Sequence, residues 1–466
     1  SYTPSIEEQA ARFVDPEREV PDVAAALQGA MDIVAEEVSD NADYRRELRR
    51  LTFDAGSLTS KAAKEEDSVY AMYYDFSEPL RKLPGHRILA IHRGEKEEFL
   101  KVALTVPEDV VLGYLYNRVL SGNRSPAEPY VREAVTDAYN RLIAPSIERE
   151  IRNDLFDTAC EGAIKVFSDN LGHLLMQPPL KGKVVLGFDP GYAHGCKLAV
   201  VDPTGKVLDT AVVYPTIKPR AEEAARVVKR LIRNYAVDVV AIGNGTASRE
   251  SEAFIAGLLK QIEKPCKYII VSEAGASIYS ASQLAAEEFP DFDVMQRSAV
   301  SIARRLQDPL AELVKIDPKG IGIGQYQHDM KQARLDEALG GVVESCVNAV
   351  GVDINTASYS LLSYIAGINQ TAAKNIVKYR EENGAFTTRG QVTKVPRIGA
   401  KAFQQCAGFL RVPGGREALD NTGVHPESYD CARRLLSMFG YSEADIANGG
   451  LTGLRQKVVR KGMQSV

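Results

Sequence analysis

The sequence of 466 residues contains no tryptophan, and its aromatic residues amount to only 7%. It has no run of 18 apolar residues, so it predicts no membrane-spanning helix. Its 6 cysteines lie far apart without a CxxC pair, which argues against a zinc site and against a disulfide framework. We therefore expect reduced, buried thiols and a cytoplasmic protein. The cysteines are Cys160, Cys196, Cys266, Cys346, Cys406 and Cys431.

The length and the charge of the chain set two further limits. A chain of this length is too long for one hydrophobic core and predicts three or four domains. Because its first residue is Ser and not Met, we expect a piece of a longer protein. The formal net charge of −5 argues against bulk electrostatic binding of a polyanion. A nucleic-acid-binding chain with this balance must concentrate its positive charge in one region.

Hydrophobic periodicity and turn signals divide the chain into six segments and predict a multidomain, mainly helical protein with one α/β domain. In the second segment we expect a charged turn at Arg93, Gly94 and Glu95 between two apolar stretches. The segments are a helical segment at 1–62, a central helical domain with short strands at 63–180, an α/β domain at 181–310, a helical linker at 311–352, a pair of helical hairpins at 353–412 and a C-terminal helical segment at 413–466.

The α/β domain is predicted from a change of texture at residue 181. KGKVVLGFDPGY is typical of a buried strand that meets a turn, and KLAVVDPTGKVLDTAVVYP is typical of a hairpin with Asp-Pro-Thr-Gly at its turn. A helix, a strand, a second helix and another strand follow. This alternation favours a sheet covered by helices.

The hairpin pair is an internal repeat at an offset of 30 residues, with IAGINQTAA (365–373) aligned on VPRIGAKAF (395–403). Each copy predicts a helix, a tight turn and a second helix. A glycine permits positive φ and leaves main-chain amides uncovered, and these amides form an anion site with the N-terminus of the next helix. We expect Asn369 to adopt the left-handed conformation after Gly367, and Ile368 and Ile398 to anchor the turns.

Local charge supports this interpretation. Residues 353–412 contain eight Lys or Arg and three acids, so their balance is 8 − 3 = +5. Contacts to phosphate carry no sequence information, so we expect sequence-tolerant, salt-sensitive binding. The alternative is that the hairpins serve only packing or protein contact. The residues predicted to bind nucleic acid are Gly367, Ile368, Asn369, Gln370, Lys374, Arg397, Ile398, Gly399, Ala400 and Lys401.

Part of a catalytic site is present in the α/β domain. Hydrolysis by two metal ions needs three or four converging carboxylates, and Asp189 and Glu273 are the two candidates. Asn244 stands where a second strand should supply an acid, and Arg297 stands where the late helix should. We therefore expect a non-enzyme without cofactor or metal. Mg²⁺ is expected only for the alternative, a metal-dependent, structure-selective nuclease.

A nucleotide site of the sugar-kinase type is a further interpretation of the Asp-Pro-Gly strand and hairpin. The sequence lacks the phosphate-binding glycine-rich loop followed by Lys and Ser or Thr. This interpretation is therefore the weakest. A protein-interaction platform is the remaining class, and retention of neither DNA nor RNA at low salt would favour it.

These segments resemble the Tex family of transcription accessory proteins over essentially the whole chain. GFDPGYAHGCKLAVVD and AIGNGTASRES are similar to its YqgF domain, an RNase H-like relative of the RuvC resolvases. IGIGQYQHDM, ESCVNAVGVDINTAS and the repeat at 362–410 are similar to its linker and helix–hairpin–helix domain. SKAAKEEDSVYAMYYDFSEPLRKLPGHRILAIHRGEKE is similar to its central helical part. The family's N-terminal segment and its C-terminal oligonucleotide-binding β-barrel have no counterpart in these residues.

The resemblance implies a protein that binds DNA and RNA and acts in transcription, near RNA polymerase or nascent RNA, without a membrane partner. It also implies a YqgF domain that has lost catalysis, in agreement with Asn244 and Arg297.

Overall fold

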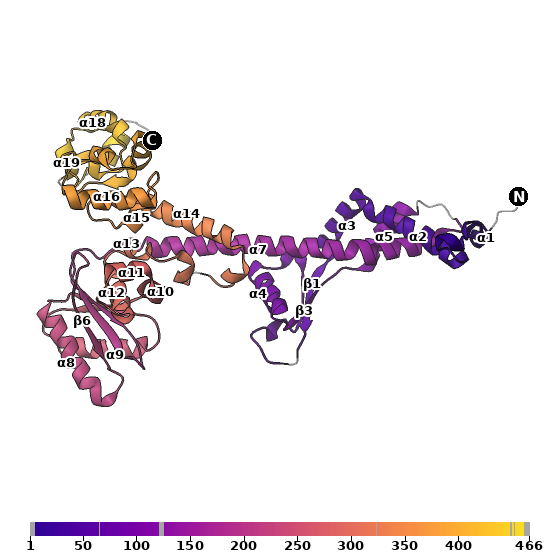
Figure 1. Cartoon of the computed structure of the whole chain (residues 1–466), viewed down its shortest axis with the longest axis horizontal. Coiled ribbons are helices and arrows are strands. Elements are labelled where there is room, and N and C mark those ends of the chain that lie inside the picture. Colours follow the sequence, from indigo (N-terminus) through magenta and orange to yellow (C-terminus); the bar gives the residue numbers. More distant parts are fainter. Residues whose placement is uncertain are drawn as a thin grey trace. The chain divides into compact units, whose positions relative to one another are not determined.

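The computed structural model describes residues 5–64, 66–120, 125–322, 324–447, 450–451 and 453–460. The chain divides into two compact units. The N-terminal unit consists of residues 1–166 with 326–331, and the C-terminal unit consists of residues 167–325 with 332–466. Figure 1 labels their helices and strands.

The N-terminal unit combines helices with a three-stranded antiparallel sheet of order β2-β1-β3. Asn41 ends one helix and caps the next, because its side chain accepts the backbone N–H groups of Asp43 and Tyr44. The helices are α1 Ile6–Ala10, α2 Val23–Asp40, α3 Ala42–Ala55, α4 Gly85–Lys96, α5 Glu108–Val119, α6 Glu128–Asp137 and α7 Ala144–Leu175, whose residues from 167 on belong to the C-terminal unit, and the strands are β1 Ser57–Ala62, β2 Asp75–Pro79 and β3 Leu100–Thr105.

Two expectations for this unit were wrong. The helical segment at 1–62 ends in β1, which pairs with β2 and β3, so a boundary after residue 62 separates strands of one sheet. The charged turn at Arg93, Gly94 and Glu95 lies inside α4. Gly94 is required there by packing, because a Cβ atom would lie 2.7 Å from Cδ1 of Leu100. The glycine that had been interpreted as a turn signal is therefore present because the helix packs closely against Leu100.

The α/β domain of the C-terminal unit has a five-stranded sheet of order β6-β5-β4-β7-β8. β4, β5 and β6 are antiparallel, whereas β4, β7 and β8 are parallel. The core residues of α8 and α9 cover one face, and those of α12 cover the other (Figure 1). The elements are β4 Val185–Asp189, β5 Cys196–Val201, β6 Val207–Val213, α8 Lys218–Asn234, β7 Val239–Gly243, α9 Ser248–Leu259, β8 Lys267–Val271, α10 Ala276–Ala281, α11 Gln283–Glu288, α12 Val294–Gln307 and α13 Pro309–Leu313.

The rest of the C-terminal unit is helical apart from the short parallel pair β9 and β10. The helix that precedes each turn of the repeat is short: four residues in α15 and a six-residue 3₁₀ helix, η8 Arg389–Lys394, in the second copy. The elements are α14 Gln332–Val350, β9 Val352–Asp353, α15 Tyr359–Leu362, α16 Gln370–Asn383, α17 Ala400–Cys406, β10 Leu410–Arg411, α18 Tyr429–Met438, α19 Glu443–Ala447 and α20 Leu454–Arg460.

The expected multidomain, mainly helical architecture with one α/β domain is confirmed. All six cysteines are free, but only four are buried, since Cys266 is half-buried and Cys431 is exposed. Within the described ranges, no helix combines the length and the apolar character that crossing a bilayer requires.

A buried arginine joins the hairpin repeat to the segment that follows it. Arg389 is 1% exposed, and its guanidinium donates to the carbonyl oxygens of Leu410, Thr422 and Val424. Its backbone N–H donates to a carboxylate oxygen of the buried Asp420 at 2.7 Å. Because a buried guanidinium without partners would be strongly destabilising, these bonds hold both segments in one arrangement.

We expect Arg389→Met to lower the free energy of unfolding by about 3 kcal/mol, because one buried and two partly buried carbonyl oxygens lose their donor. Urea unfolding of the whole chain measures this change. The matched control is Arg416→Met at an exposed arginine, which should alter stability by less than about 0.5 kcal/mol. Equal stability of the two variants would contradict the assigned role of Arg389.

Candidate nucleic-acid interface

Both copies of the repeat bend through the same type of turn. The N–H of Ile368 donates to the carbonyl oxygen of Ile365 at 3.0 Å, and the N–H of Ile398 donates to that of Val395 at 3.1 Å. The third residue of each turn has positive φ, 82° at Gly367 and 74° at Arg397. Positive φ at this position alone defines a type II turn. In the second copy an arginine, not a glycine, therefore has the left-handed conformation.

The residue after each turn holds the N-cap position of the next helix. Asn369 has φ −81°, and its side chain accepts the N–H of Ala372 at 2.9 Å. The expectation of a left-handed Asn369 was therefore wrong, because the asparagine serves as an N-cap. Gly399, with φ −84°, holds the same position but has no side chain to cap with. The second hairpin consequently leaves one more main-chain amide, that of Ala402, uncovered at its helix N-terminus.

The turns are exposed, and their central isoleucines are buried. Ile368 and Ile398 are each 3% exposed, so they anchor the turns as expected. The first two residues of each following helix are on the surface, where their N–H groups have no acceptor within the helix. These surface positions are Gly367, Asn369, Gln370, Thr371, Arg397, Gly399, Ala400 and Lys401.

The two hairpins hold each other in place. Asn375 of α16 donates from Nδ2 to the carbonyl oxygen of Pro396 in the second turn at 3.0 Å. In the reciprocal contact, a Cβ atom at Gly367 would lie 2.8 Å from Cβ of Gln405 in α17. Asn375 and Gln405 are 30 residues apart, as are the two turns, so the contacts form a pseudo-twofold pair. The distance between the uncovered amides of the two hairpins is therefore set by packing. Gly367 is required both by its positive φ and by its close contact with Gln405.

The charge of the repeat is smaller on its surface than in its sequence. Arg389 is buried, Arg380 donates to the carbonyl oxygen of Ile354, and Arg411 donates to that of Gly408. Burial lowers the pKa of Arg380 and of Arg411. These three arginines are engaged by main-chain carbonyl oxygens of the fold. The exposed basic residues are Lys374, Lys378, Lys394, Arg397 and Lys401.

The exposed basic side chains differ in whether they contact an acidic or aromatic side chain. Lys378 pairs with Glu382 at 3.7 Å, and Lys374 lies over the ring of Tyr359. Arg397 and Lys401 form no ion pair with any described residue. They flank the amides of the second hairpin, so this hairpin combines the larger number of uncovered amides with unpaired positive charge.

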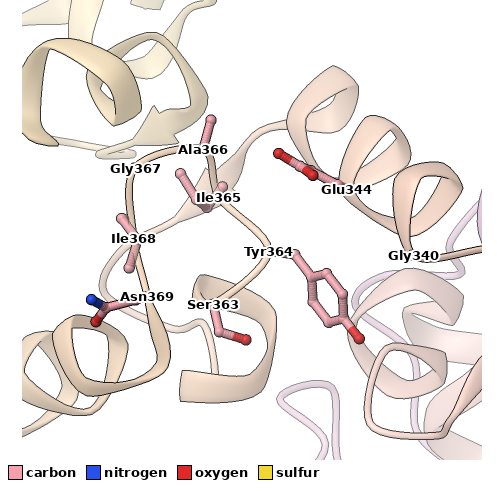
Figure 2. Close-up of a pocket in the computed structure, with 9 residues that line it drawn as sticks. All are labelled: Gly340, Glu344, Ser363, Tyr364, Ile365, Ala366, Gly367, Ile368 and Asn369. Carbon is pink, nitrogen blue, oxygen red and sulfur yellow. The ribbon is translucent and has the colours of Figure 1, made fainter. Parts of the chain in front are cut away.

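A carboxylate faces the first hairpin. Its turn lines a cavity of about 590 Å³ together with Glu344 of α14, and Figure 2 shows Glu344 extending toward Ile365 and Ala366. Asn348 of the same helix accepts the N–H of Ala366 at 3.3 Å and donates to the carbonyl oxygen of Tyr364. The first hairpin is therefore tied to α14, and its local potential is less positive than that of the second.

In the α/β domain the fold brings Asp189 and Glu273 together, because β4, β7 and β8 are parallel and their carboxyl ends meet at one edge. Burial raises the pKa of Asp189, while a hydrogen bond from Ser298 and the charge of Lys197 oppose that shift. Burial and the nearby charge of Asp189 raise the pKa of Glu273. The negative charge of Asp189 thus disfavours the ionised form of Glu273.

The carboxylate of Glu273 packs directly against the main chain of Gly245. Its N–H donates to Oδ1 of Asn244 at 3.0 Å, and a Cβ atom at Gly245 would lie 1.6 Å from its Oε1. Its Oε2 is buried without a hydrogen-bond partner among the described residues. The guanidinium of Arg297 points elsewhere, because it donates to the carbonyl oxygens of Phe289 and Ser280. Arg297 therefore does not stand at this edge in place of an acid, as the sequence had suggested.

The residues at this edge do not fit a two-metal centre. In the part of the chain that the structure describes, no three His, Cys, Asp or Glu side chains are grouped to hold a metal ion. The late helix contributes the hydroxyl of Ser298, and Lys197 of β5 lies opposite Asp189 in the sheet. Two carboxylates beside a lysine provide fewer ligands than two-ion chemistry needs.

We expect the α/β domain to lose stability as the pH rises, because the folded pKa of Asp189 lies above its unfolded value of about 3.9. Between the two pKa values the native state binds more protons, so stability is highest below this window. Asp189→Asn should therefore raise the free energy of unfolding at pH 8 and have a smaller effect near pH 4. Urea unfolding at both pH values tests this, and an equal effect at both would contradict it.

A third hairpin, which was not predicted from the sequence, consists of α18 and α19 on either side of Gly440, whose φ is 73°. Phe439 and Tyr441 on either side of this glycine were the sequence signal that could have predicted the hairpin.

The comparisons with known proteins also place helical hairpins in both of these segments. A helix-hairpin-helix motif model matches residues 347–411, and an HHH domain model matches residues 417–463. The Tex central region-like model matches residues 2–167, and the Tex protein YqgF-like domain model matches residues 183–307.

Relatives match almost the whole chain. It is 51% identical over 452 residues to the uncharacterized protein YdcI of Bacillus subtilis (strain 168), covering 96% of this chain and 62% of that protein. It is 46% identical over 448 residues to the transcriptional accessory protein Tex of Neisseria gonorrhoeae, covering 94% and 58%. It is 39% identical over 504 residues to the human S1 RNA-binding domain-containing protein 1, covering 93% and 50%.

The chain therefore spans less than two thirds of the length of these relatives. Two Tex-specific models match its central region and its α/β domain, and a protein named Tex aligns with 94% of it. The chain belongs to the Tex family.

Proposed function

We propose that this chain is the nucleic-acid-binding part of a transcription accessory factor, and that its tandem hairpins contact the phosphate backbone of DNA or RNA. The observation that carries the proposal is the pair of exposed type II turns, each followed by a helix N-terminus with uncovered amides. Main-chain donors at a helix N-terminus suit a phosphate oxygen and do not distinguish bases. Binding is therefore sequence-tolerant.

The second hairpin is the stronger of the two contacts. It has one more free amide and two unpaired basic side chains, whereas Glu344 faces the first turn. Arg397 also has a left-handed backbone, which costs an L-residue about 1–2 kcal/mol. A strained residue with an exposed charge points to a role outside folding.

The proposal extends to the partners of the whole protein. One relative is named a transcriptional accessory protein, and the human relative is named for an S1 RNA-binding domain. On that basis we assign this chain a place near RNA polymerase or nascent RNA. The α/β domain then serves as a scaffold without catalysis, supported by Asn244, Ser298 and Lys197 where acidic metal ligands are needed.

We expect Arg397→Glu with Lys401→Glu to weaken binding to single- and double-stranded probes at least tenfold at 50 mM salt. Both substitutions place negative charge beside the second set of amides. The slope of log K against log salt should become shallower by about 1–2, because up to two phosphate contacts are lost. Fluorescence anisotropy at several salt concentrations gives both quantities.

Two single variants serve as matched controls. Arg397→Gly removes the charge and relieves the left-handed strain, so it should weaken binding while stability stays level or rises by up to about 1 kcal/mol. Glu344→Gln should strengthen binding about twofold, because it removes the carboxylate at the first turn. Undiminished binding by the double variant would show that the hairpins are not the contact surface.

A structure-selective nuclease is the second candidate, favoured by the meeting of Asp189 and Glu273 in one buried site. We expect no cleavage of four-way-junction or flap DNA in Mg²⁺ or Mn²⁺, because too few carboxylates converge for two-ion chemistry. Gel assays with the unmodified chain and with Asp189→Asn decide the question. Products that require Asp189 would establish the nuclease and overturn the scaffold role.

A further inference from the structure

The edge strand β8 of the α/β domain is covered by the helices less completely than its neighbour β7. In the last parallel pair, Val240, Ala241 and Ile242 of β7 lie beside Tyr268, Ile269 and Ile270 of β8. The three residues of β7 are completely buried, whereas those of β8 are 37%, 46% and 41% exposed.

The side chains of Tyr268, Ile269 and Ile270 are only partly covered, although the hydroxyl of Tyr268 donates to Glu252 of α9 at 3.2 Å. Val240 and Ile242 pack with residues of α8 and α9, and Ala241 packs with residues of α12. Tyr268 and Ile270 lie on the α8–α9 face and Ile269 on the α12 face, because residues aligned in a parallel pair share a face. None of these three side chains belongs to either core cluster. Three consecutive exposed apolar residues on an edge strand favour aggregation unless a partner covers them.

The outer main-chain groups of β8 are also free. The N–H of Lys267 donates to Asp238 and the carbonyl oxygen of Val271 accepts from Asn244, so the odd-numbered residues face β7. The N–H and C=O groups of Tyr268 and Ile270 therefore point away from the sheet. Among the described residues, none accepts from or donates to these four groups. These unpaired N–H and C=O groups could form strand hydrogen bonds with a sixth strand.

The segment that leads into this edge strand is mainly basic. Lys260, Lys264 and Lys267 are exposed, and none forms an ion pair within the described ranges, while Glu263 is the exposed acid among them. Lys264 donates to the carbonyl oxygen of Ala236, which places it beside the C-terminal end of α8. The exposed Arg230 and Arg233 continue the positive surface there.

We propose that β8 is a docking edge for an extended acidic protein segment with alternating aliphatic residues, which adds a sixth strand to the sheet. Such a segment pairs with the main chain of Tyr268 and Ile270, covers the apolar side chains and brings negative charge to the lysines. A nucleic acid fits the lysines but has no strand main chain to pair with the edge. A second copy of this chain pairs with the edge but brings a further set of lysines.

The probe for this edge is a fluorescein-labelled ten-residue peptide of alternating valine and glutamate. We expect it to bind the whole chain in fluorescence anisotropy, and an alternating valine–lysine peptide to bind at least tenfold more weakly. N-methylation of alternate amides of the valine–glutamate peptide should abolish binding, because it removes the strand hydrogen bonds and leaves the charge unchanged. Absence of binding up to millimolar peptide, or equal binding of the N-methylated form, would overturn the proposal.

The matching protein variant is Ile270→Pro, which removes an outward N–H and leaves the pairing with β7 in place. It should weaken peptide binding at least tenfold, with circular dichroism as the folding check. Lys264→Glu with Lys267→Glu should weaken binding without changing the strand, and this double variant decides the question if the proline variant does not fold.

Two results would identify another occupant. Dimers in sedimentation velocity that Ile270→Pro abolishes would identify a second copy of the chain. Displacement of the peptide by a single-stranded oligonucleotide would identify a nucleic-acid surface. Either result would contradict the proposal.

Discussion

The reciprocal contact between the two hairpins is the constraint on which the proposed interface depends. Gly367 can approach α17 only because it lacks a Cβ atom, and Asn375 holds the backbone of the second turn from α16. The two sets of amides are consequently fixed relative to each other before any ligand arrives. Preorganised donors of this kind lose little conformational entropy on binding, which is why rigid turns suit a repetitive polyanion.

The surface separates charge that stabilises the fold from charge that is available to a ligand. Arg380, Arg389 and Arg411 donate to main-chain carbonyl oxygens in and next to the repeat, whereas Arg397 and Lys401 form no ion pair with the described residues. The number of basic residues in the segment therefore overstates the positive potential at its surface. The position of the free charges beside the second hairpin matters more for binding than the total charge. A chain with a net charge of −5 can still present one strongly positive turn.

The sequence predicted the elements whose signals are local. The apolar strand before Asp189, the hairpin after it and the repeat at residues 365 and 395 all have period or turn chemistry within a few residues. It failed where tertiary packing decides. Gly94 serves close packing inside a helix, Asn369 caps a helix, and Arg397 is left-handed because the turn geometry demands it. The meeting of Asp189 with Glu273 follows from strand order, whereas the direction of Arg297 depends on carbonyl groups that no sequence pattern reveals.

The bonds of Arg389 have a consequence for how this part of the chain can be divided. The guanidinium starts within the first helix–hairpin–helix match, 347–411, and ends on carbonyl oxygens of the second, 417–463. Two modules that are separate by sequence similarity are thus joined by one buried side chain. A fragment cut between them, near residue 412, would keep the acceptor at Leu410 but lose those at Thr422 and Val424, so the pair is better suited than either half to transfer between proteins as a unit.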